Sequence, residues 1–312
     1  MALFEMNDLA PFSQERSAFG RHETFGLRYG WLTKGYLALK KREDIFISED
    51  ATVELGVGKN MVNAIRYWLQ AARIIQKTNL GLEPTKIGKR IFGSKGWDPY
   101  LEDEATIWLV HWLIASNAEL ATAFYWFFNN FHKPEFSSQE ASTALMDFVK
   151  QNIKNRTSAS TVKNDAAILL RMYSRSKGNT RTPVEDALDS PLSLLGLISQ
   201  APGGRTYYSR ALEREGLPIG IFGFAVAEVF NAMRVSELPI EDLMYAKGVY
   251  PAPGAVFRLT ENAMLTKLER LIYQLPGVFE LRETAGIHQL YMLEETDPLA
   301  ILQLHYENQL QE

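Results

Sequence analysis

The stretch Ser48–Lys77, SEDATVELGVGKNMVNAIRYWLQAARIIQK, carries most of the information about the fold. Ser48 is a favourable N-terminal cap for a short predicted helix. Residues 56–58, Gly-Val-Gly, end that helix, and a second helix is predicted from Lys59 towards Lys77. A short helix, a glycine turn and a longer helix follow one another as in a helix-turn-helix unit.

The second predicted helix has two faces of different chemistry. Apolar side chains recur at steps of three and four on the core-facing side, among them Ile65 and Trp68. The opposite stripe contains no acid and consists of Lys59, Asn63, Arg66, Gln70, Arg73 and Lys77. Asn and Arg can read base edges and Lys can neutralise phosphates, so the stripe predicts a surface that contacts double-stranded DNA. The alternative is an ordinary amphipathic helical hairpin with a polar outer face.

Residues 82–90 follow this helix and are also basic. They are predicted to form a wing beside the DNA groove, with Lys86, Lys89 and Arg90 as further DNA contacts. A second candidate helix follows the Ser/Thr-rich residues 157–161 and presents Lys163. A capped surface helix without a DNA contact is the alternative there.

The charge is divided unevenly along the chain. The net charge is −4, yet residues 59–95 hold eight Lys or Arg against one acid, and residues 150–181 again hold eight against one. From residue 235 onwards, five basic residues face twelve acidic ones. Two basic windows attract phosphates wherever they share a face, whereas the acidic end favours a protein partner.

Turn signals divide the 312 residues into three predicted parts. These are an N-terminal helical domain (1–134) with the helix-turn-helix and an aromatic core, a helical middle domain (135–235), and a C-terminal winged-helix-like domain (236–312). In the last part we expect helices over 239–246 and 261–273, a turn into a strand over 253–260, and a hairpin of 278–283 with 287–293 around the turn 284–286. The predicted fold class is mainly α, with strands only in wings and after Ala255.

Composition removes several classes of function. There are no cysteines, which excludes disulfides, thiolate nucleophiles and iron–sulfur clusters. The most apolar stretch, residues 107–131, is interrupted by polar side chains, so no membrane association is expected. The N-terminus shows no basic segment followed by an apolar run, and a cytoplasmic location is the expectation.

One candidate for catalysis precedes the helix-turn-helix. His22 and Glu23 lie beside Arg21 and Arg28, so a possible base or metal ligand stands next to cations that can hold a phosphate. His22, Glu23 and Arg28 are therefore the predicted catalytic residues. The alternative is that this segment only anchors the first helix to the core, with His22 bonded to the backbone.

A weaker candidate is the acidic run that opens the helix after residue 98. Asp98, Glu102, Asp103 and His111 are types that bind a hard divalent ion, and Mg²⁺ or Mn²⁺ is the expected cofactor if the protein cuts DNA. Acidic residues are also what a helix N-terminus prefers, and a histidine between tryptophans is typical of a satisfied core residue. No nuclease or phosphate-loop motif occurs elsewhere.

The chain resembles an uncharacterised bacterial domain family encoded beside DNA phosphorothioation genes, which includes the SspB-type proteins of the single-strand phosphorothioation system. The resemblance covers nearly the whole chain and rests on long strings, namely residues 19–32 (FGRHETFGLRYGWL), 55–62 (LGVGKNMV), 98–103 (DPYLED) with 106–108 and 111–112, and 185–192 (EDALDSPL).

The resemblance implies a DNA-nicking component of a phage-defence system that replaces a phosphate oxygen by sulfur. Its implied partners are a cysteine desulfurase, an ATPase and a sulfur-activating pyrophosphatase. No catalytic motif of the family can be carried over residue by residue. A DNA-binding adaptor that recruits partner proteins without cutting DNA, and a transcriptional regulator, are the two alternatives.

Overall fold

A computed structural model describes residues 9–174, 190–284, 286–307 and 310. Within these residues, α-helices dominate and the strands form only small antiparallel sheets, the largest of three strands. The predicted mainly α fold class is therefore confirmed. None of the described helices is long and apolar enough to cross a bilayer.

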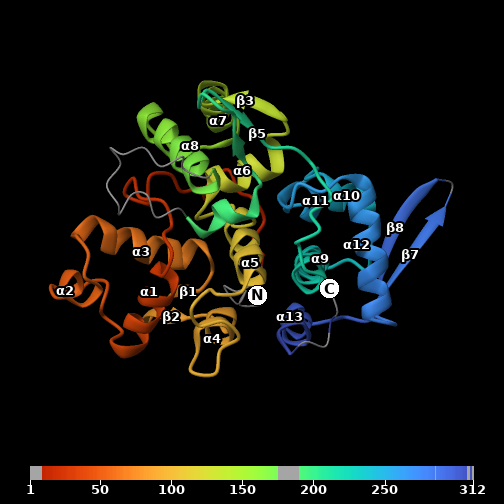
Figure 1. The fold of residues 1–312 in the computed structure, drawn as a ribbon, viewed down its shortest axis with the longest axis horizontal. Helices are drawn as coiled ribbons and strands as arrows, with labels where there is room; N and C mark the ends of the chain where they lie inside the picture. Colours follow the sequence, from red (N-terminus) through yellow and green to blue (C-terminus); the bar gives the residue numbers. More distant parts are fainter. Residues whose placement is uncertain (1–8, 175–189, 285, 308–309, 311–312) are drawn as a thin grey trace.

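The first group of elements contains the stretch that opened the sequence analysis (Figure 1, lower left). Two helices joined by the Gly56–Gly58 turn occur where they were predicted, and Gly56 takes the left-handed conformation (φ 58°) that suits a helix C-terminus. The second helix ends at Ala71, so its predicted continuation to Lys77 is wrong. The elements are α1 (Trp31–Lys41), α2 (Ala51–Leu55), α3 (Lys59–Ala71), β1 (Ile75–Thr78) and β2 (Gly81–Pro84), and the two strands pair as a hairpin.

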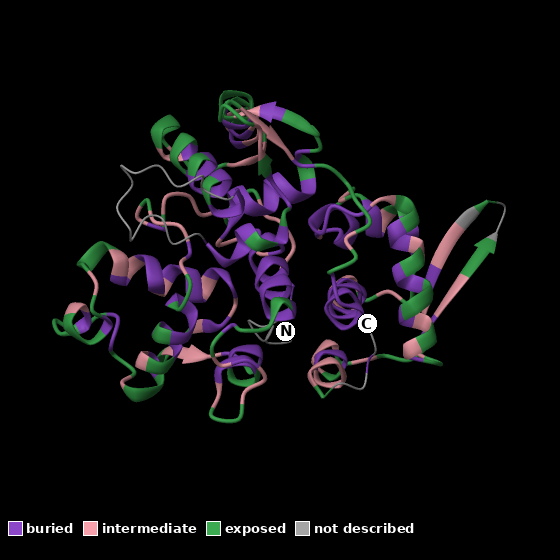
Figure 2. Cartoon of the chain, in the orientation of Figure 1, coloured by how far each residue is buried: buried purple, intermediate pink, exposed green. Residues whose placement is uncertain are grey.

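Three helices follow. The first, α4 (Lys86–Phe92), packs on α1 at the lower edge of Figure 1, and the other two, α5 (Glu104–Ala115) and α6 (Thr122–Asn130), form the middle of the core. Every residue of α5 from Ala105 to Ala115 is buried, because other helices pack around its whole circumference. Figure 2 shows this continuous burial in the middle of the molecule.

The second group of elements lies above α5 in Figure 1. It comprises β3 (Glu135–Ser137), α7 (Ser138–Asn152), α8 (Ala159–Tyr173), the 3₁₀ helix η1 (Pro191–Leu195), β4 (Ser199–Gln200) and β5 (Thr206–Tyr208). Ser137 and Glu140 cap α7 reciprocally, as a capping box does. Ser158 caps α8 by accepting from the Thr161 amide, which confirms the predicted cap in the Ser/Thr-rich segment.

The third group lies on the right of Figure 1, where the β7–β8 hairpin projects from the molecule. It comprises α9 (Ile219–Met233), β6 (Glu237–Pro239), α10 (Ile240–Met244), α11 (Pro253–Val256), α12 (Glu261–Gln274), β7 (Phe279–Thr284), β8 (Ile287–Met292) and α13 (Pro298–Tyr306). The hairpin and α12 confirm the prediction, although Ala285 in its turn lies outside the described residues. The strand predicted over 253–260 is wrong, because residues 253–256 form a helical turn that Pro253 begins.

The last two groups share one strand order. In each group a short strand comes first, two or more helices follow, and a hairpin comes last. The first strand pairs with the last strand of the hairpin, which gives the sheets β3-β5-β4 and β6-β8-β7. The first group has the same helix–helix–hairpin sequence without the leading strand. The expectation that strands lie only in wings and after Ala255 is thus wrong for β3 and β6, which precede their helices.

The core is continuous across these groups. One cluster of buried apolar side chains extends from Leu9 to Leu310. The late helix α13 packs on α9, and its Tyr306 stacks on Trp97 (centroids 4.7 Å apart) and contacts the Thr106 hydroxyl at 2.8 Å. The division at residues 134 and 235 stays a prediction.

Candidate nucleic-acid interface

Helix α3 presents the polar stripe that its sequence predicted. Its inner side buries Ile65, Trp68 and Leu69 completely. On its outer side Lys59 is exposed, while Asn63, Arg66 and Gln70 are half-buried. Among the described residues, neither Lys59 nor Arg66 has an ion-pair partner. Their charges are therefore available to an anionic ligand.

Arg73 does not belong to this stripe. It follows the end of α3 in a left-handed conformation (φ 54°), which turns its side chain inward. Its guanidinium donates to both carboxylate oxygens of Glu228 on α9, at 3.1 and 2.7 Å, and the same carboxylate accepts from the indole N–H of Trp112 at 2.7 Å. Both side chains of the ion pair are about 10% exposed. The expectation of a DNA contact from Arg73 is incompatible with this buried position.

The residues expected to form a wing are distributed differently. The hairpin after α3 is β1–β2, and Lys77 is an exposed residue of β1. Residues 82–84 lie in β2 of this hairpin, but Lys86, Lys89 and Arg90 lie on the helix α4, which Thr85 caps. The predicted wing over residues 82–90 is therefore wrong from Thr85 onwards. All three cations of α4 are exposed, and Arg90 lies over the Trp97 ring at 5.9 Å.

The loop of residues 20–24 lies between α3 and α8 and is hydrogen-bonded to both helices. The carboxylate of Asp165 on α8 accepts the Gly20 amide at 2.9 Å, and Arg171, later on α8, donates to the Thr24 carbonyl at 3.0 Å. On the other side, the Asn63 amide of α3 reaches the Glu23 carboxylate at 3.5 Å. Two segments about 100 residues apart in sequence are thereby held on either side of one loop.

This loop is strained and tightly fixed. Glu23 and Thr24 both have positive φ (50° and 67°), a conformation that costs a non-glycine residue about 1–3 kcal/mol. Gly20 also has a positive φ, and a Cβ there would lie 2.7 Å from the Thr161 side chain. Only glycine therefore fits at position 20, where the chain turns against α8.

His22 is the residue that holds the loop in place. It is 1% exposed and stacks on Trp68 of α3 with an interplanar angle of 9°. Its Nδ1 accepts the Thr24 amide at 3.2 Å, so the ring proton lies on Nε2, which donates to Asp165 at 3.1 Å. Both nitrogens are thus occupied by the protein, which leaves neither to take a proton from water or substrate.

The other two predicted catalytic residues lie at the edge of the same loop. Glu23 is half-buried and contacts Asn63. Arg28 lies over the rings of Phe25 and Trp31, at 5.9 and 5.4 Å from their centroids. The structure brings these residues near α3 but does not place them around a common cavity with His22.

On α8, Lys163 is exposed, as is Arg171. Lys163 has no ion pair within the part of the chain that the structure describes. Arg21, in the connecting loop, is exposed as well. Lys59 and Arg66 thus lie on the helix that contacts this loop through Asn63, and Lys163 and Arg171 lie on the helix that contacts it through Asp165 and Arg171. We call Lys59, Arg66, Arg21, Lys163 and Arg171 the basic face.

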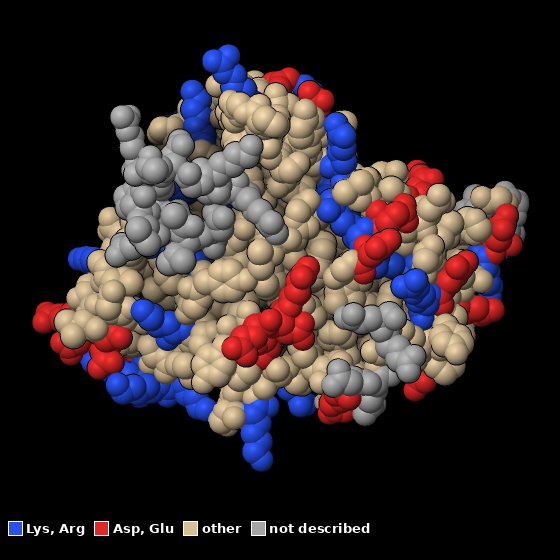
Figure 3. Space-filling view, in the orientation of Figure 1, with Lys and Arg blue, Asp and Glu red and all other residues tan. Residues whose placement is uncertain are grey.

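The acidic run has a structural role at the start of α5. Asp98 is buried, and its two oxygens accept the amides of Glu102 and Asp103 at 2.9 and 3.1 Å. Asp103 in turn caps α5 by accepting the Ala105 amide. Figure 3 shows acidic side chains gathered over this region in the middle of the view, and basic ones along the lower left edge.

His111 lies far inside and is fully satisfied. Its Nε2 donates to the Val256 carbonyl at 2.9 Å and its Nδ1 accepts from the Tyr173 hydroxyl at 2.7 Å. Burial lowers the pKa of His111 to about 3, and the cations of Arg258 and Arg214 act in the same direction. It does not converge with Asp98, Glu102 or Asp103, and no group of three possible metal ligands occurs among the described residues.

Taken together, the fold and this site define a helical protein with repeated helix–hairpin groups and two basic helices held by one loop. The chain belongs to the family described as protein of unknown function (DUF4007), whose model matches residues 19–306. None of the curated proteins compared with the chain matches it.

Two solved structures are similar over almost the whole chain. The SspB crystal structure has a TM-score of 0.82 and 26% identity, and the match covers 95% of this chain and 90% of that one. The magnesium ion-bound SspB crystal structure has a TM-score of 0.84 and 26% identity, covering 95% and 89%. The resemblance inferred from the sequence is confirmed. In the described part of this chain the acidic run does not gather into a group of three possible metal ligands, and the Asp98 oxygens accept the amides of Glu102 and Asp103.

Proposed function

We propose that the protein is a DNA-binding component of a DNA phosphorothioation system and holds double-stranded DNA on the basic face. The similarity to SspB supports the link to that system. The observation that carries the DNA contact is the loop of residues 20–24, which fixes α3 and α8 next to each other through Asn63, Asp165 and Arg171. Cations from both basic windows then face one phosphate backbone together.

The strand orders support a more specific assignment of the fold. In a winged-helix unit the third helix enters the major groove and a hairpin flanks it. We assign the three helix–hairpin groups as three such units, with α3, α8 and α12, the last α-helix before each hairpin, as the helices that would enter the groove. Lys59 and Arg66 on α3 and Lys163 on α8 have no ion-pair partner in the described ranges, whereas α12 carries Glu261, Glu269 and Arg270 on its exposed positions. The first two units are therefore the ones that suit DNA.

DNA nicking receives less support than DNA binding. His22 is buried with both ring nitrogens in hydrogen bonds, and the Asp98 carboxylate accepts the amides of Glu102 and Asp103 just before α5. These contacts favour the second candidate, a DNA-binding adaptor that positions partner enzymes such as the expected ATPase and pyrophosphatase. A transcriptional regulator would use the same basic face.

The experiment is a charge reversal with a matched control. Lys59→Glu, Arg66→Glu and Lys163→Glu together should abolish retention of a fluorescein-labelled duplex, measured by fluorescence anisotropy. The control is Lys40→Glu with Lys95→Glu, two exposed lysines of α1 and the α4–α5 connection outside the basic face. Each lost phosphate contact should lower the slope of log affinity against log salt by about 0.9.

Wild-type affinity in the folded triple variant would remove the basic face from the proposal. Conversion of supercoiled plasmid to nicked circles by the purified wild-type chain, with Mg²⁺ or Mn²⁺ and not with chelator, would separate a nickase from an adaptor. The adaptor predicts that the plasmid stays supercoiled under all these conditions.

A further inference from the structure

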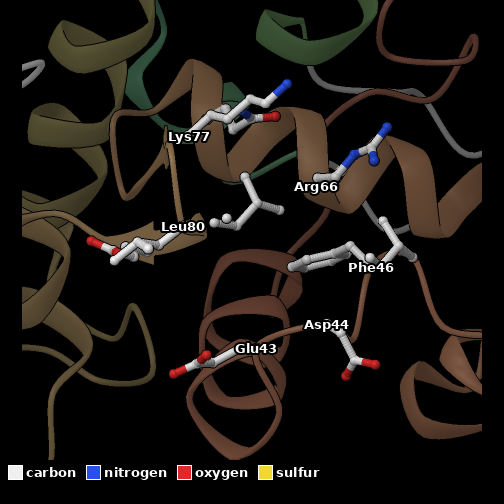
Figure 4. A pocket seen from close by; sticks show the side chains of 11 residues that line it. Glu43, Asp44, Phe46, Arg66, Lys77 and Leu80 are labelled. Atoms are coloured by element: carbon white, nitrogen blue, oxygen red, sulfur yellow. The ribbon is translucent and has the colours of Figure 1, made fainter.

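A groove of about 640 Å³ lies beside α3, away from the loop of residues 20–24. One wall is formed by α3 and β1, with Arg66, Gln70 and Lys77. The opposite wall is the connection between α1 and α2, with Glu43 and Asp44. Figure 4 shows Arg66 and Lys77 on one side, the two acids on the other, and Phe46 between them.

The charges of this groove do not suit DNA. Its lining contains two cations, Arg66 and Lys77, and three carboxylates, those of Glu43, Asp44 and Glu83. Arg42 already pairs with Asp44, but Glu43 has no ion-pair partner among the described residues. A phosphate backbone carries one sign of charge throughout and would be repelled by the acidic wall. A ligand with charges of both signs, one towards each wall, is complementary to it.

Two large apolar side chains at the rim of the groove are almost fully exposed to solvent. Leu80 is at the tip of the β1–β2 hairpin and is 91% exposed, and Ile47 on the opposite wall is 78% exposed. The tip has a hydrogen bond of its own, in which the Thr78 hydroxyl accepts the Leu80 amide at 3.2 Å. Leu82 and Phe46 continue the apolar surface inside the groove. Exposed apolar side chains that continue an apolar groove and are bordered by polar residues mark a site of protein interaction.

We propose that this groove binds a segment of a partner protein. The segment carries an aliphatic or aromatic anchor that packs between Leu80 and Ile47. An acidic residue on one side of the anchor meets Arg66 and Lys77, and a basic residue on the other side meets Glu43 and Asp44. This proposal goes beyond DNA binding and does not depend on it. The groove shares Arg66 with the basic face, but none of its other lining residues belongs to that face.

Random peptides displayed on phage are the probe. They are selected on the full wild-type chain and counter-selected on the Leu80→Lys variant. Enriched peptides should share an apolar residue between an acidic and a basic one. For a synthetic copy of such a peptide, Leu80→Lys should weaken binding at least about tenfold. The control is Val53→Lys, an equally exposed position on α2 (82%), which should leave the affinity unchanged.

A charge exchange tests the orientation of the segment. Glu43→Lys with Asp44→Lys should weaken the peptide about tenfold, and replacing the basic residue of the peptide by Glu should restore its affinity to the variant. The proposal is overturned if no peptide is enriched on the wild type over Leu80→Lys, or if the charge exchange has no effect. It is also overturned if Leu80→Lys changes duplex affinity in the anisotropy assay in either direction, because the hairpin tip would then belong to the DNA surface.

Discussion

Glu228→Gln should be among the most damaging single substitutions in this protein, although it removes no atom from the core. The Glu228 carboxylate accepts two hydrogen bonds from Arg73 and one from Trp112, and the ion pair is about 90% buried. An amide at this position still offers an oxygen to Trp112, but it leaves the guanidinium of Arg73 without a counter-charge. Breaking a buried pair on one side costs about 3–5 kcal/mol.

The free energy of unfolding, measured by urea denaturation followed by tryptophan fluorescence, gives the test. Glu15→Gln is the control, because its ion pair with Lys154 is at the surface, where solvent screens it and its loss should hardly change stability. Replacing both Arg73 and Glu228 by Met should cost less than Glu228→Gln alone, since no charge is then left buried. A loss below about 1 kcal/mol for Glu228→Gln would refute the reasoning and would return Arg73 to the candidates for a DNA contact.

Two further predictions concern the histidines. The folded-state pKa of His111 is about 3 and its unfolded value is 6.5, so between these values the unfolded chain binds a proton that the folded chain does not. The contribution of the neutral His111 to stability is complete above pH 6.5 and falls by up to about 1.4 kcal/mol per pH unit below it. In urea titrations from pH 7 to 5, the free energy of unfolding of His111→Gln should therefore fall less steeply with decreasing pH than that of the wild type. His22→Ala should cost about 1–3 kcal/mol, because the buried Asp165 loses a donor, while Glu23→Gln should change stability little. A folded His22→Ala protein that lost plasmid nicking shown by the wild type would contradict the anchoring role.

Local sequence patterns predicted α2, α3 and the late hairpin correctly, because glycine turns and apolar periodicity act within a few residues. The end of α3 was missed because the left-handed turn at Arg73 is stabilised by Glu228, which is 155 residues away. A signal for this existed in the sequence. Glu228 is the only charged residue of the apolar helix Ile219–Met233, and such a lone acid predicts a buried cationic partner. It does not tell which cation.

The candidate site also depends on contacts between residues that are far apart in the sequence. The two basic windows were visible in the sequence, but their meeting at residues 20–24 depends on Asp165, which lies on the apolar side of α8 and was not singled out. His22 was selected as a catalytic candidate, whereas its contacts are those of a buried residue that fixes the loop. A histidine beside arginines indicates an anion site when it is exposed, and the burial that excludes this comes from Trp68 and α8, neither of which is near it in sequence.

The contacts of α9 and α13 also have a consequence for synthesis on the ribosome. Arg73 can form its ion pair only after residue 228 has left the ribosome. Trp97 and Thr106 can contact Tyr306 only later still. The helices that carry the basic face are therefore translated long before the partners that complete their core. A chain released early would expose Trp97 and a buried arginine without its carboxylate. Incomplete copies should thus be substrates for proteases rather than competitors for DNA.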